Sequence, residues 1–374
     1  MRPTIKIDLK NNAFDFLRLL FALFVVFAHS RYLYGAEDFL HWNAKGFDNL
    51  HAGTIGVWGF FAISGFLVTT SWFNSKGAGD FFAKRFKRIF PGFWVSLLVC
   101  SFFFAPLWYF LKQHTLNDFF SNNAFYIWKF ISSNLDSVIT VQSIGSVAID
   151  AINGPLWTVH HELCAYIFLA ALGILGFLRS KDRPVKGWMI LTITLLINAL
   201  RITYTYNDSF SQIYGTWFGD ERFLLFLSIF MWGVTINLYK DLLVPHWPGA
   251  LFSLIMLILG TKFEFLPIVL PFCFSYLIIS LCFMLPFKNI SKKIGDLSYG
   301  IYLYHWPVRL TLQMLGFQAS LGLWSFIALN ILIALPFAYL SWNLVEKRFL
   351  AHVKPQQNVM PEITPSETII PTLN

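Results

Sequence analysis

The stretch RLLFALFVVFAH, residues 18–29, is an apolar run that begins with an arginine and ends with a histidine. Such a run is typical of a membrane-spanning helix, where an ionisable side chain near the centre costs about 2.5–3.5 kcal/mol. Packing alone does not explain why the chain carries that cost. Arg18 and His29 are therefore the first candidates for functional residues.

The composition of the whole chain is that of a membrane protein. Of its 374 residues, 56% are hydrophobic and only 13% are charged, and the mean hydropathy is +0.58. Such values predict several membrane spans. The formal net charge of +8 comes from basic residues dispersed between apolar runs, which indicates membrane topology and excludes nucleic acid as the expected partner. The first apolar stretch has no small-residue cleavage motif, so we expect it to be retained.

The positions of the apolar runs predict the number of spans. A bilayer core of about 30 Å needs roughly 20 apolar residues as helix. Ten runs meet or approach this length: 14–30, 55–72, 89–111, 156–178, 188–204, 221–239, 249–262, 266–286, 299–316 and 322–343. We therefore predict an all-α integral membrane protein with about ten transmembrane helices. Its transmembrane domain, residues 14–350, lies between a short N-terminal segment, 1–13, and a disordered tail, 351–374.

The distribution of lysine and arginine predicts the orientation. If the N-terminus is cytoplasmic, 19 of these residues fall in cytoplasmic segments and 5 in outer segments. This bias predicts that both termini are cytoplasmic. The sequence shows no internal repeat of the kind that transporters often have, which argues weakly against a carrier.

In the first span, Arg18 and His29 lie three helical turns apart, about 16 Å along the axis, and so share one face. The predicted orientation places Arg18 in the inner half of the membrane and His29 near its outer surface. Asp15 is on the same face and is a candidate partner for Arg18. The alternative is that Arg18 extends to the inner headgroups and His29 merely lies at the interface.

The segment GPLWTVHHELCAYIF, residues 154–168, places three ionisable groups, His160, His161 and Glu162, at a depth similar to that of His29. A histidine beside a carboxylate can act as a general base for a hydroxyl nucleophile, so we expect His29 to act with Glu162. The alternative is a structural network in which Arg201, Arg222 or a tryptophan N–H holds Glu162. No zinc signature is present, and the four cysteines fit a packing role, so we expect no metal.

The segment GAGDFFAKRFKRIFPGFW, residues 77–94, is read as an inner loop with an R-x-x-R spacing. Arg85 and Arg88 lie one helical turn apart with Lys84 beside them. Two guanidinium groups on one face suit the phosphates of a ligand, because arginine offers planar bidentate donation. Anionic lipid headgroups would explain the same residues equally well.

Two further segments carry polar side chains. GTIGVWGFFAISGFL, residues 53–67, contains Ser64 among glycines that favour close helix packing, so we do not expect Ser64 to act as a nucleophile. SYGIYLYHWPV, residues 298–308, contains Tyr302 and His305. His305 either faces a polar cavity or hydrogen-bonds to a neighbouring helix.

Together these segments resemble the membrane-bound acyltransferase 3 family. The resemblance rests on six motifs in order: FDFLRLLFALFVVFAHS with its R-x10-H pair, IGVWGFFAISGFL, KRFKRIFPGFW, GPLWTVHHE, SYGIYLYHWP and WNLVEKRF. It covers residues from about 14 to 350, which is nearly the whole chain. Trp157 belongs to the fourth motif, which has the form L-W-[ST]-x-x-x-E.

The resemblance implies a bacterial O-acetyltransferase of the inner membrane, in a stand-alone form without a fused esterase-like domain. Such an enzyme moves an acetyl group from cytoplasmic acetyl-CoA, as a co-substrate rather than a bound cofactor, to a sugar hydroxyl of a surface glycan, a lipid-linked oligosaccharide or lipopolysaccharide O-antigen. It implies His29 as the catalytic histidine, Arg18 as its partner on the donor's path, Glu162 as the acidic partner, and Arg85 and Arg88 as ligands of the coenzyme A phosphates.

The sequence leaves three alternatives open. A transporter of a lipid-linked sugar or small solute would also have ten spans and buried charges. The same fold could acylate a secreted metabolite or peptidoglycan. Finally, His29 could form an acyl-histidine intermediate instead of acting as a base.

Overall fold

The computed structural model describes residues 11–36, 42–44, 47–111, 119, 152–178, 183–207 and 221–351. Most of the segment 1–13, most of the outer loop 112–155, and the tail from residue 352 lie outside these ranges. The helices of the first half are α1 (Phe14–Leu33), α2 (Ala52–Phe73), α3 (Ala78–Val99), the π-helical turn η1 (Cys100–Phe104), α4 (Ala105–Leu111), the 3₁₀ turn η3 (Gly154–Leu156) and α6 (Trp157–Ile174). The helices of the second half are α7 (Arg183–Tyr206), α9 (Glu221–Leu238), α10 (Trp247–Lys262), α11 (Leu266–Met284), α12 (Ser291–Ile294), α13 (Ser298–Met314), α14 (Phe317–Ser320), α15 (Leu323–Leu340), the π-helical turn η5 (Ser341–Glu346) and α16 (Lys347–Ala351).

Seven helical segments in the described part of the chain are long and apolar enough to cross a membrane: Phe14–Leu33, Ala52–Phe73, Ala78–Leu111, Gly154–Ile174, Gly187–Tyr206, Leu266–Met284 and Leu323–Leu350. The shorter apolar helices Arg222–Leu238 and Trp247–Lys262 coincide with two more of the predicted spans. Helix α13 coincides with the remaining one. The chain is therefore a multi-pass helical protein, as its composition predicted.

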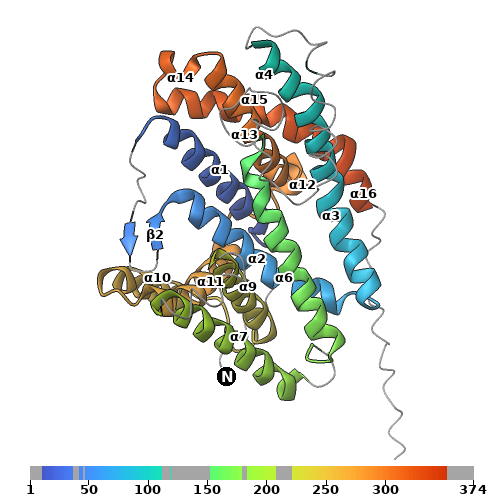
Figure 1. Cartoon of the computed structure of the whole chain (residues 1–374). Helices are drawn as coiled ribbons and strands as arrows, with labels where there is room; N and C mark the ends of the chain where they lie inside the picture. Colours follow the sequence, from blue (N-terminus) through green and yellow to red (C-terminus); the bar gives the residue numbers. More distant parts are fainter. Residues whose placement is uncertain are drawn as a thin grey trace, which may run out of the picture.

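The helices form a bundle with α1 and α2 at its centre (Figure 1). On one side, α13 packs against α1, and α15 packs against both. On the other side, α9 and α11 pack against α2, with α7 and α10 outside them. Helix α6 contacts α2, α3 and α9, which brings its polar first turns to the centre of the bundle.

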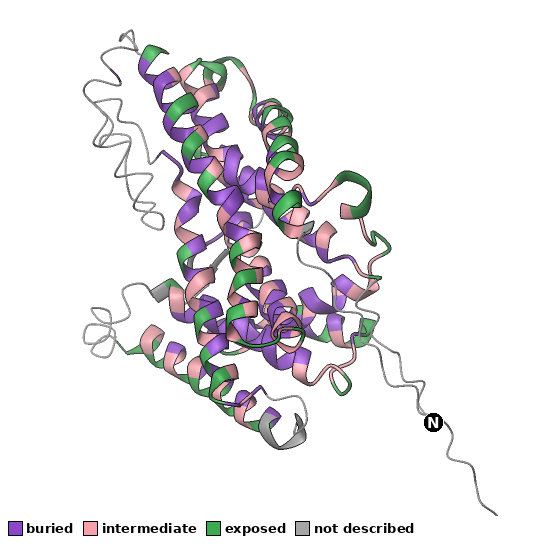
Figure 2. Cartoon of the chain, turned by 90° about the vertical axis from the view of Figure 1, so that its right-hand side faces the viewer, coloured by how far each residue is buried: buried purple, intermediate pink, exposed green. Residues whose placement is uncertain are grey.

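Buried side chains gather where the helices face one another, and exposed side chains cover the outward sides (Figure 2). Many of the exposed side chains are large and apolar, including four on α10: Leu251, Phe252, Ile255 and Ile258. A protein in water rarely exposes so much apolar surface, whereas lipid covers it without cost. The outward surface of the bundle thus suits a bilayer.

One local prediction was wrong. The basic segment predicted as an inner loop is helical from Ala78, and α3 continues through η1 and α4 to Leu111. Asp80 in the first turn favours this start because its carboxylate accepts from the backbone N–H of Lys76 and pairs with Lys84 at i+4. The all-helical class is confirmed, and a short antiparallel hairpin of β1 (Trp42–Ala44) and β2 (Phe47–Leu50) lies between α1 and α2. Strands this short are missed by a search for long apolar runs.

Helices α2 and α9 meet at two glycines. A Cβ atom on Gly65 would lie 2.0 Å from the carbonyl oxygen of Phe230, and a Cβ atom on Gly233 would lie 2.4 Å from that of Ala62. Because both obstacles are backbone atoms, no side-chain rotation could relieve the clash. The small residues therefore fix the distance between the two helices.

We expect Gly65→Ala to destabilise the protein by roughly 1–3 kcal/mol, because the added methyl group must push α9 away from α2. The measurement is the melting temperature of the purified full-length protein. Gly79→Ala is the matched control, since nothing lies within 4 Å of a Cβ atom on that α3 glycine. Equal melting temperatures for the two variants would contradict this account of the α2–α9 contact.

Candidate active site

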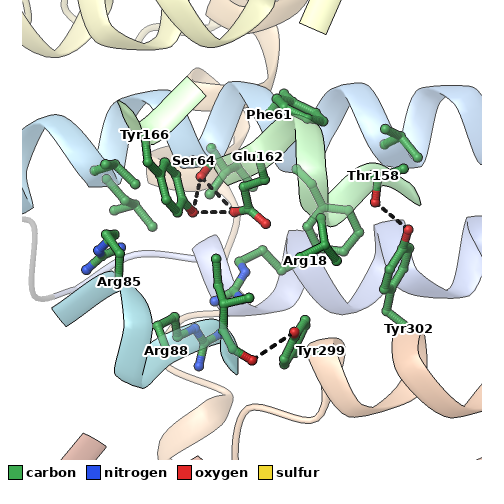
Figure 3. Close-up of a pocket in the computed structure, with 17 residues that line it drawn as sticks. Arg18, Phe61, Ser64, Arg85, Arg88, Thr158, Glu162, Tyr166, Tyr299 and Tyr302 are labelled. Carbon is green, nitrogen blue, oxygen red and sulfur yellow. Dashed lines mark hydrogen bonds between the residues drawn. The ribbon is translucent and has the colours of Figure 1, made fainter. Parts of the chain in front are cut away.

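Three arginines face one internal cavity of about 270 Å³ between α1, α2, α3, α6 and α13. We call it the arginine pocket; its polar lining residues are Arg18, Ser64, Arg85, Arg88, Thr158, Glu162, Tyr166, Tyr299 and Tyr302. Figure 3 shows Arg85 and Arg88 from α3 approaching Arg18 from α1. The R-x-x-R pair and the arginine of the first span thus belong to one site, although more than sixty residues separate them in the chain.

Asp296, in the segment between α12 and α13, holds two of these arginines. Its Oδ2 atom accepts from Arg18 Nη1 at 2.9 Å and from Arg88 Nη2 at 2.5 Å, while Oδ1 accepts from Ser298 at 2.7 Å. Burial alone raises the pKa of the Asp296 carboxyl, but the charges of Arg18 and Arg88 outweigh burial and hold this pKa well below its ordinary value. The carboxylate therefore stays charged and fixes both guanidinium groups.

Asp296 replaces the partner expected for Arg18. The sequence suggested Asp15, but Asp15 accepts a hydrogen bond from Ser291 at the start of α12. Lys84, expected beside the two arginines, points elsewhere as well: its ammonium group donates to Asp80 at 2.8 Å and to the carbonyl oxygen of Asn74 at 2.8 Å. Lys84 is absent from the residues that line the arginine pocket.

Glu162 lies in the arginine pocket with Ser64 and Tyr166 (Figure 3). Its Oε1 atom accepts from the Tyr166 hydroxyl and from Ser64 Oγ, the latter at 3.1 Å. Ser64 Oγ is also 2.9 Å from the Tyr166 hydroxyl. The Arg85 guanidinium lies over the Tyr166 ring at 6.0 Å and donates to Ser71 at 3.1 Å. Glu162 thus balances part of the positive charge of the pocket.

The expected pair of His29 and Glu162 is wrong as a direct contact, because each has other partners. His29 Nδ1 lies 2.9 Å from Nε2 of His305 on α13. The prediction failed because similar depth along two helices does not make their side chains neighbours. The sequence was compatible with two roles for His305, facing a polar cavity or bonding to a neighbouring helix. The structure shows the second, a hydrogen bond to His29 on α1.

The hydrogen bonds of His305 determine which nitrogen of His29 is basic. His305 Nδ1 lies 2.9 Å and 3.1 Å from the carbonyl oxygens of Tyr302 and Ile301, and carbonyl oxygens only accept. Nδ1 of a neutral His305 therefore carries the hydrogen, and its Nε2 accepts from Nδ1–H of His29. In this tautomer Nε2 of His29 has a free lone pair, which is what a general base needs.

Arg309 and Trp306 hold the His29 segment in place. Arg309 Nη1 donates to the carbonyl oxygen of His29 at 3.1 Å, and its guanidinium stacks on Trp306 at 4.0 Å. The Trp306 ring also meets the His29 ring edge-on, with centroids 4.8 Å apart. The position of His29 is thus set by contacts with α13 at both its backbone and its ring.

His29 lines a second cavity of about 690 Å³, which we call the histidine pocket. Its other polar and aromatic lining residues are His51, Thr54, Trp58, Trp157, Thr158, Arg201, Thr205, Arg222, Phe226 and Tyr302. Arg222 lies over the Trp157 ring at 4.3 Å. The aromatic faces and hydrogen-bonding groups of this pocket suit a polar organic molecule such as a sugar.

His160 and His161 do not join His29. His161 bonds to the carbonyl oxygen of Trp157 at 3.1 Å and packs against Phe226, whereas His160 is exposed and lies near Cys164. Within the described part of the chain, no three histidine, cysteine, aspartate or glutamate side chains lie close enough to hold a metal ion.

Several site residues were not found from the sequence, among them Asp296, Tyr166 and Arg309. Two of them had a local signal, since Tyr166 follows Glu162 by four residues and Arg309 follows His305 by four, which places each pair on one helical face. Asp296 had no such signal, because it lies in a short connection and reaches helices that are distant in the sequence.

The bundle of apolar helices thus holds an arginine cluster and an oriented histidine in two cavities. The model of the acyltransferase 3 family, described as an acyltransferase domain, matches residues 11–343. The chain therefore belongs to this family of acyltransferases. Membership favours an enzyme over the transporter considered above.

Several relatives carry names of this activity. The chain is 31% identical to an O-acetyl transferase of Shigella phage Sf6 over 93% of its own length and 98% of the relative's. It is 29% identical to nodulation protein 10 of Rhizobium leguminosarum bv. viciae, over 90% and 92% of the two lengths. It is 28% identical to the peptidoglycan O-acetyltransferase OatA of Listeria monocytogenes, over 68% of this chain and 45% of the relative. No solved structure matches.

We expect Asp296→Asn to destabilise the protein by up to about 3–5 kcal/mol, because Arg18 and Arg88 lose the charge that holds them. The pKa of Asp296 is lowered in the folded state, so its stabilisation is present above the unfolded-state value of 3.8 and is lost as the pH falls further. The melting temperature of variant and wild type should therefore differ at neutral pH and converge in acid. Asp80→Asn, at a partly exposed pair, should have a smaller effect.

Proposed function

We propose that the protein transfers an acetyl group from cytoplasmic acetyl-CoA to a sugar hydroxyl of a surface polysaccharide or lipopolysaccharide O-antigen. The observation that carries the proposal is the pair of adjoining pockets, one with three arginines and the other with a histidine whose free nitrogen is basic. Relatives named O-acetyl transferase and peptidoglycan O-acetyltransferase support acetyl as the group transferred and a hydroxyl as its acceptor.

The arginine pocket fits the donor. Coenzyme A carries phosphate groups, which guanidinium groups bind by paired hydrogen bonds. Three guanidinium groups, those of Arg18, Arg85 and Arg88, line the arginine pocket together with one carboxylate, that of Glu162. This lining favours an anionic ligand. The excess of lysine and arginine on the predicted cytoplasmic side supports entry of the donor from that side.

The histidine pocket fits the acceptor. In the proposed reaction, Nε2 of His29 takes the proton of the acceptor hydroxyl while the hydroxyl oxygen attacks the thioester carbonyl. The C–O bond forms, the C–S bond breaks and coenzyme A leaves as a thiolate that takes up a proton. His305 keeps the ring of His29 in the reactive tautomer throughout. The same nitrogen would attack the thioester if the reaction ran through an acyl-histidine.

The proposal includes a location and an acceptor class. We place the enzyme in the bacterial inner membrane, with the glycan or a lipid-linked oligosaccharide reaching His29 from the outer side. Peptidoglycan or a secreted metabolite would meet His29 in the same way, because the pocket offers aromatic faces and hydrogen-bonding groups to any polyhydroxylated molecule.

We expect His29→Ala to abolish acetylation, because no other group then removes the proton of the hydroxyl. His305→Leu should lower the rate by about 10²–10⁴-fold, the usual contribution of general base catalysis, because His29 loses the acceptor that sets its tautomer. His305→Gln, which offers an oxygen in place of Nε2, should retain more activity than His305→Leu. The measurement is mass spectrometry of surface glycan from cells with equal amounts of each protein. Full acetylation with His29→Ala would exclude the proposed role.

We expect Arg85→Ala to raise KM for acetyl-CoA about tenfold, because a hydrogen-bonded charge is worth roughly 1.5–3 kcal/mol. Lys84→Ala is the matched control in the adjacent position, and its KM should stay near that of the wild type because Lys84 pairs with Asp80 outside the pocket. The rate is measured at varied acetyl-CoA with full-length protein in lipid nanodiscs. An equal rise in KM for both variants would show only a general effect of positive charge.

A further inference from the structure

The arginine pocket and the histidine pocket share three lining residues: Val57 on α2, Thr158 in the first turn of α6, and Tyr302 on α13. The two cavities therefore adjoin, and these three side chains stand between them. In the proposed reaction the thioester must pass this point, because the phosphate-binding arginines line one cavity and His29 lines the other.

Hydrogen bonds join two of the three residues. The hydroxyl of Thr158 lies 2.5 Å from that of Tyr302, and the Tyr302 hydroxyl donates to the carbonyl oxygen of Pro155. The Thr158 hydroxyl also lies 3.4 Å from the Pro155 carbonyl oxygen, so the two hydroxyl groups and this carbonyl form one hydrogen-bonded cluster. The contact connects α13 to the start of α6 across the boundary of the two pockets (Figure 3).

Tyr302 is also linked to the catalytic histidine. Its backbone carbonyl oxygen accepts from Nδ1 of His305, which in turn sets the tautomer of His29. The edge of the Phe60 ring packs against the Tyr302 ring, with centroids 6.1 Å apart. Tyr302 is thus a buried side chain whose only polar atom lies at the boundary and whose backbone supports the base.

We propose that Tyr302 and Thr158 form a partition that keeps the thioester away from His29 and the water of the histidine pocket until an acceptor hydroxyl enters. An acceptor can open it, because both side chains also line the histidine pocket and a sugar hydroxyl can exchange hydrogen bonds with them. Tyr302 thus positions the thioester and His305 and does not itself react. The inference rests on the proposed function, since it concerns the path of its donor.

The partition matters because water competes with the acceptor. If a thioester reaches His29 without an acceptor, His29 takes a proton from water, the oxygen attacks the carbonyl and the C–S bond breaks. The products are acetate and coenzyme A, whose thiolate takes up a proton. A closed partition prevents this loss, so weakening it should raise hydrolysis relative to transfer.

The test uses Tyr302→Phe, which removes the hydroxyl and keeps the ring, and Thr158→Val, which removes the hydroxyl and keeps the branched shape. Release of coenzyme A from radiolabelled acetyl-CoA is measured without acceptor, with full-length protein in lipid nanodiscs. Surface acetylation is measured in cells. We expect the ratio of hydrolysis to transfer to rise about fivefold in each variant, as suits the loss of one hydrogen bond. Adding His29→Ala should return the release of coenzyme A to the background rate measured without protein.

Tyr276→Phe is the matched control, because the Tyr276 hydroxyl also donates to a backbone carbonyl, that of Val244 at 2.9 Å, but lines neither pocket. A raised ratio in either test variant, with Tyr276→Phe unchanged, supports the partition. An unchanged ratio in both test variants, or an equal rise in Tyr276→Phe, overturns it. Failure of the proposed function gives a different result, in which the wild type shows no His29-dependent acetylation of surface glycan.

Discussion

The bonds of one carboxylate to two guanidinium groups organise the interior of this protein. Asp296 ties α1 to α3 through Arg18 and Arg88, and it lies just before α13, so three parts of the bundle meet at a single charge. Charges inside a membrane protein are tolerated only where they pair or face a polar cavity, and this cluster does both. Because the cluster fixes α1 at one end, it also fixes the helix that carries His29 at the other end. The arginines therefore line a cavity and, through Arg18, also hold the helix that carries His29.

The two pockets divide the chemistry between separate environments. The arginine pocket combines three guanidinium groups with one carboxylate and suits phosphate, whereas the histidine pocket combines His29 with aromatic rings and with two other arginines, Arg201 and Arg222. Both are built on α2, α6 and α13, so in the proposed function one set of helices supports the donor site and the acceptor site together. The proposed arrangement would allow reactants from opposite sides of a membrane to react without either of them crossing it completely. Membership of the acyltransferase 3 family is consistent with two such sites.

The sequence predicted the positions of the helices better than the contacts between them. The apolar runs gave the positions of the helices, and the spacing of Arg18 and His29 placed them correctly on one helix, α1. The partner of Glu162 was mistaken because its direction depends on how α6 is rotated against α2 and α13, and rotation follows from packing between helices that one sequence does not reveal. Lys84, predicted to lie beside the two arginines, lies outside the arginine pocket for a local reason, because it pairs with Asp80 four residues earlier. Asp296 could not be found at all, because its role depends entirely on residues more than two hundred positions away.

The glycine contact between α2 and α9 limits how the walls of the pockets can move. The backbones of α2 and α9 are in direct contact at Gly65 and Gly233, so the two helices cannot approach each other further. Helix α2 forms one wall of both pockets, and this contact fixes its position against α9. The opposite wall is α13, which contains Pro307 and is held to α6 by the side chains of Tyr302 and Thr158 rather than by tight backbone contact. Helix α13 also carries His305, and its Gly300 lies equally close to the backbone of α15, since a Cβ atom there would be 2.6 Å from the Cα atom of Ala338. One helix, held firmly on its far side, thus supports both the side chain at the boundary of the pockets and the residue bonded to His29.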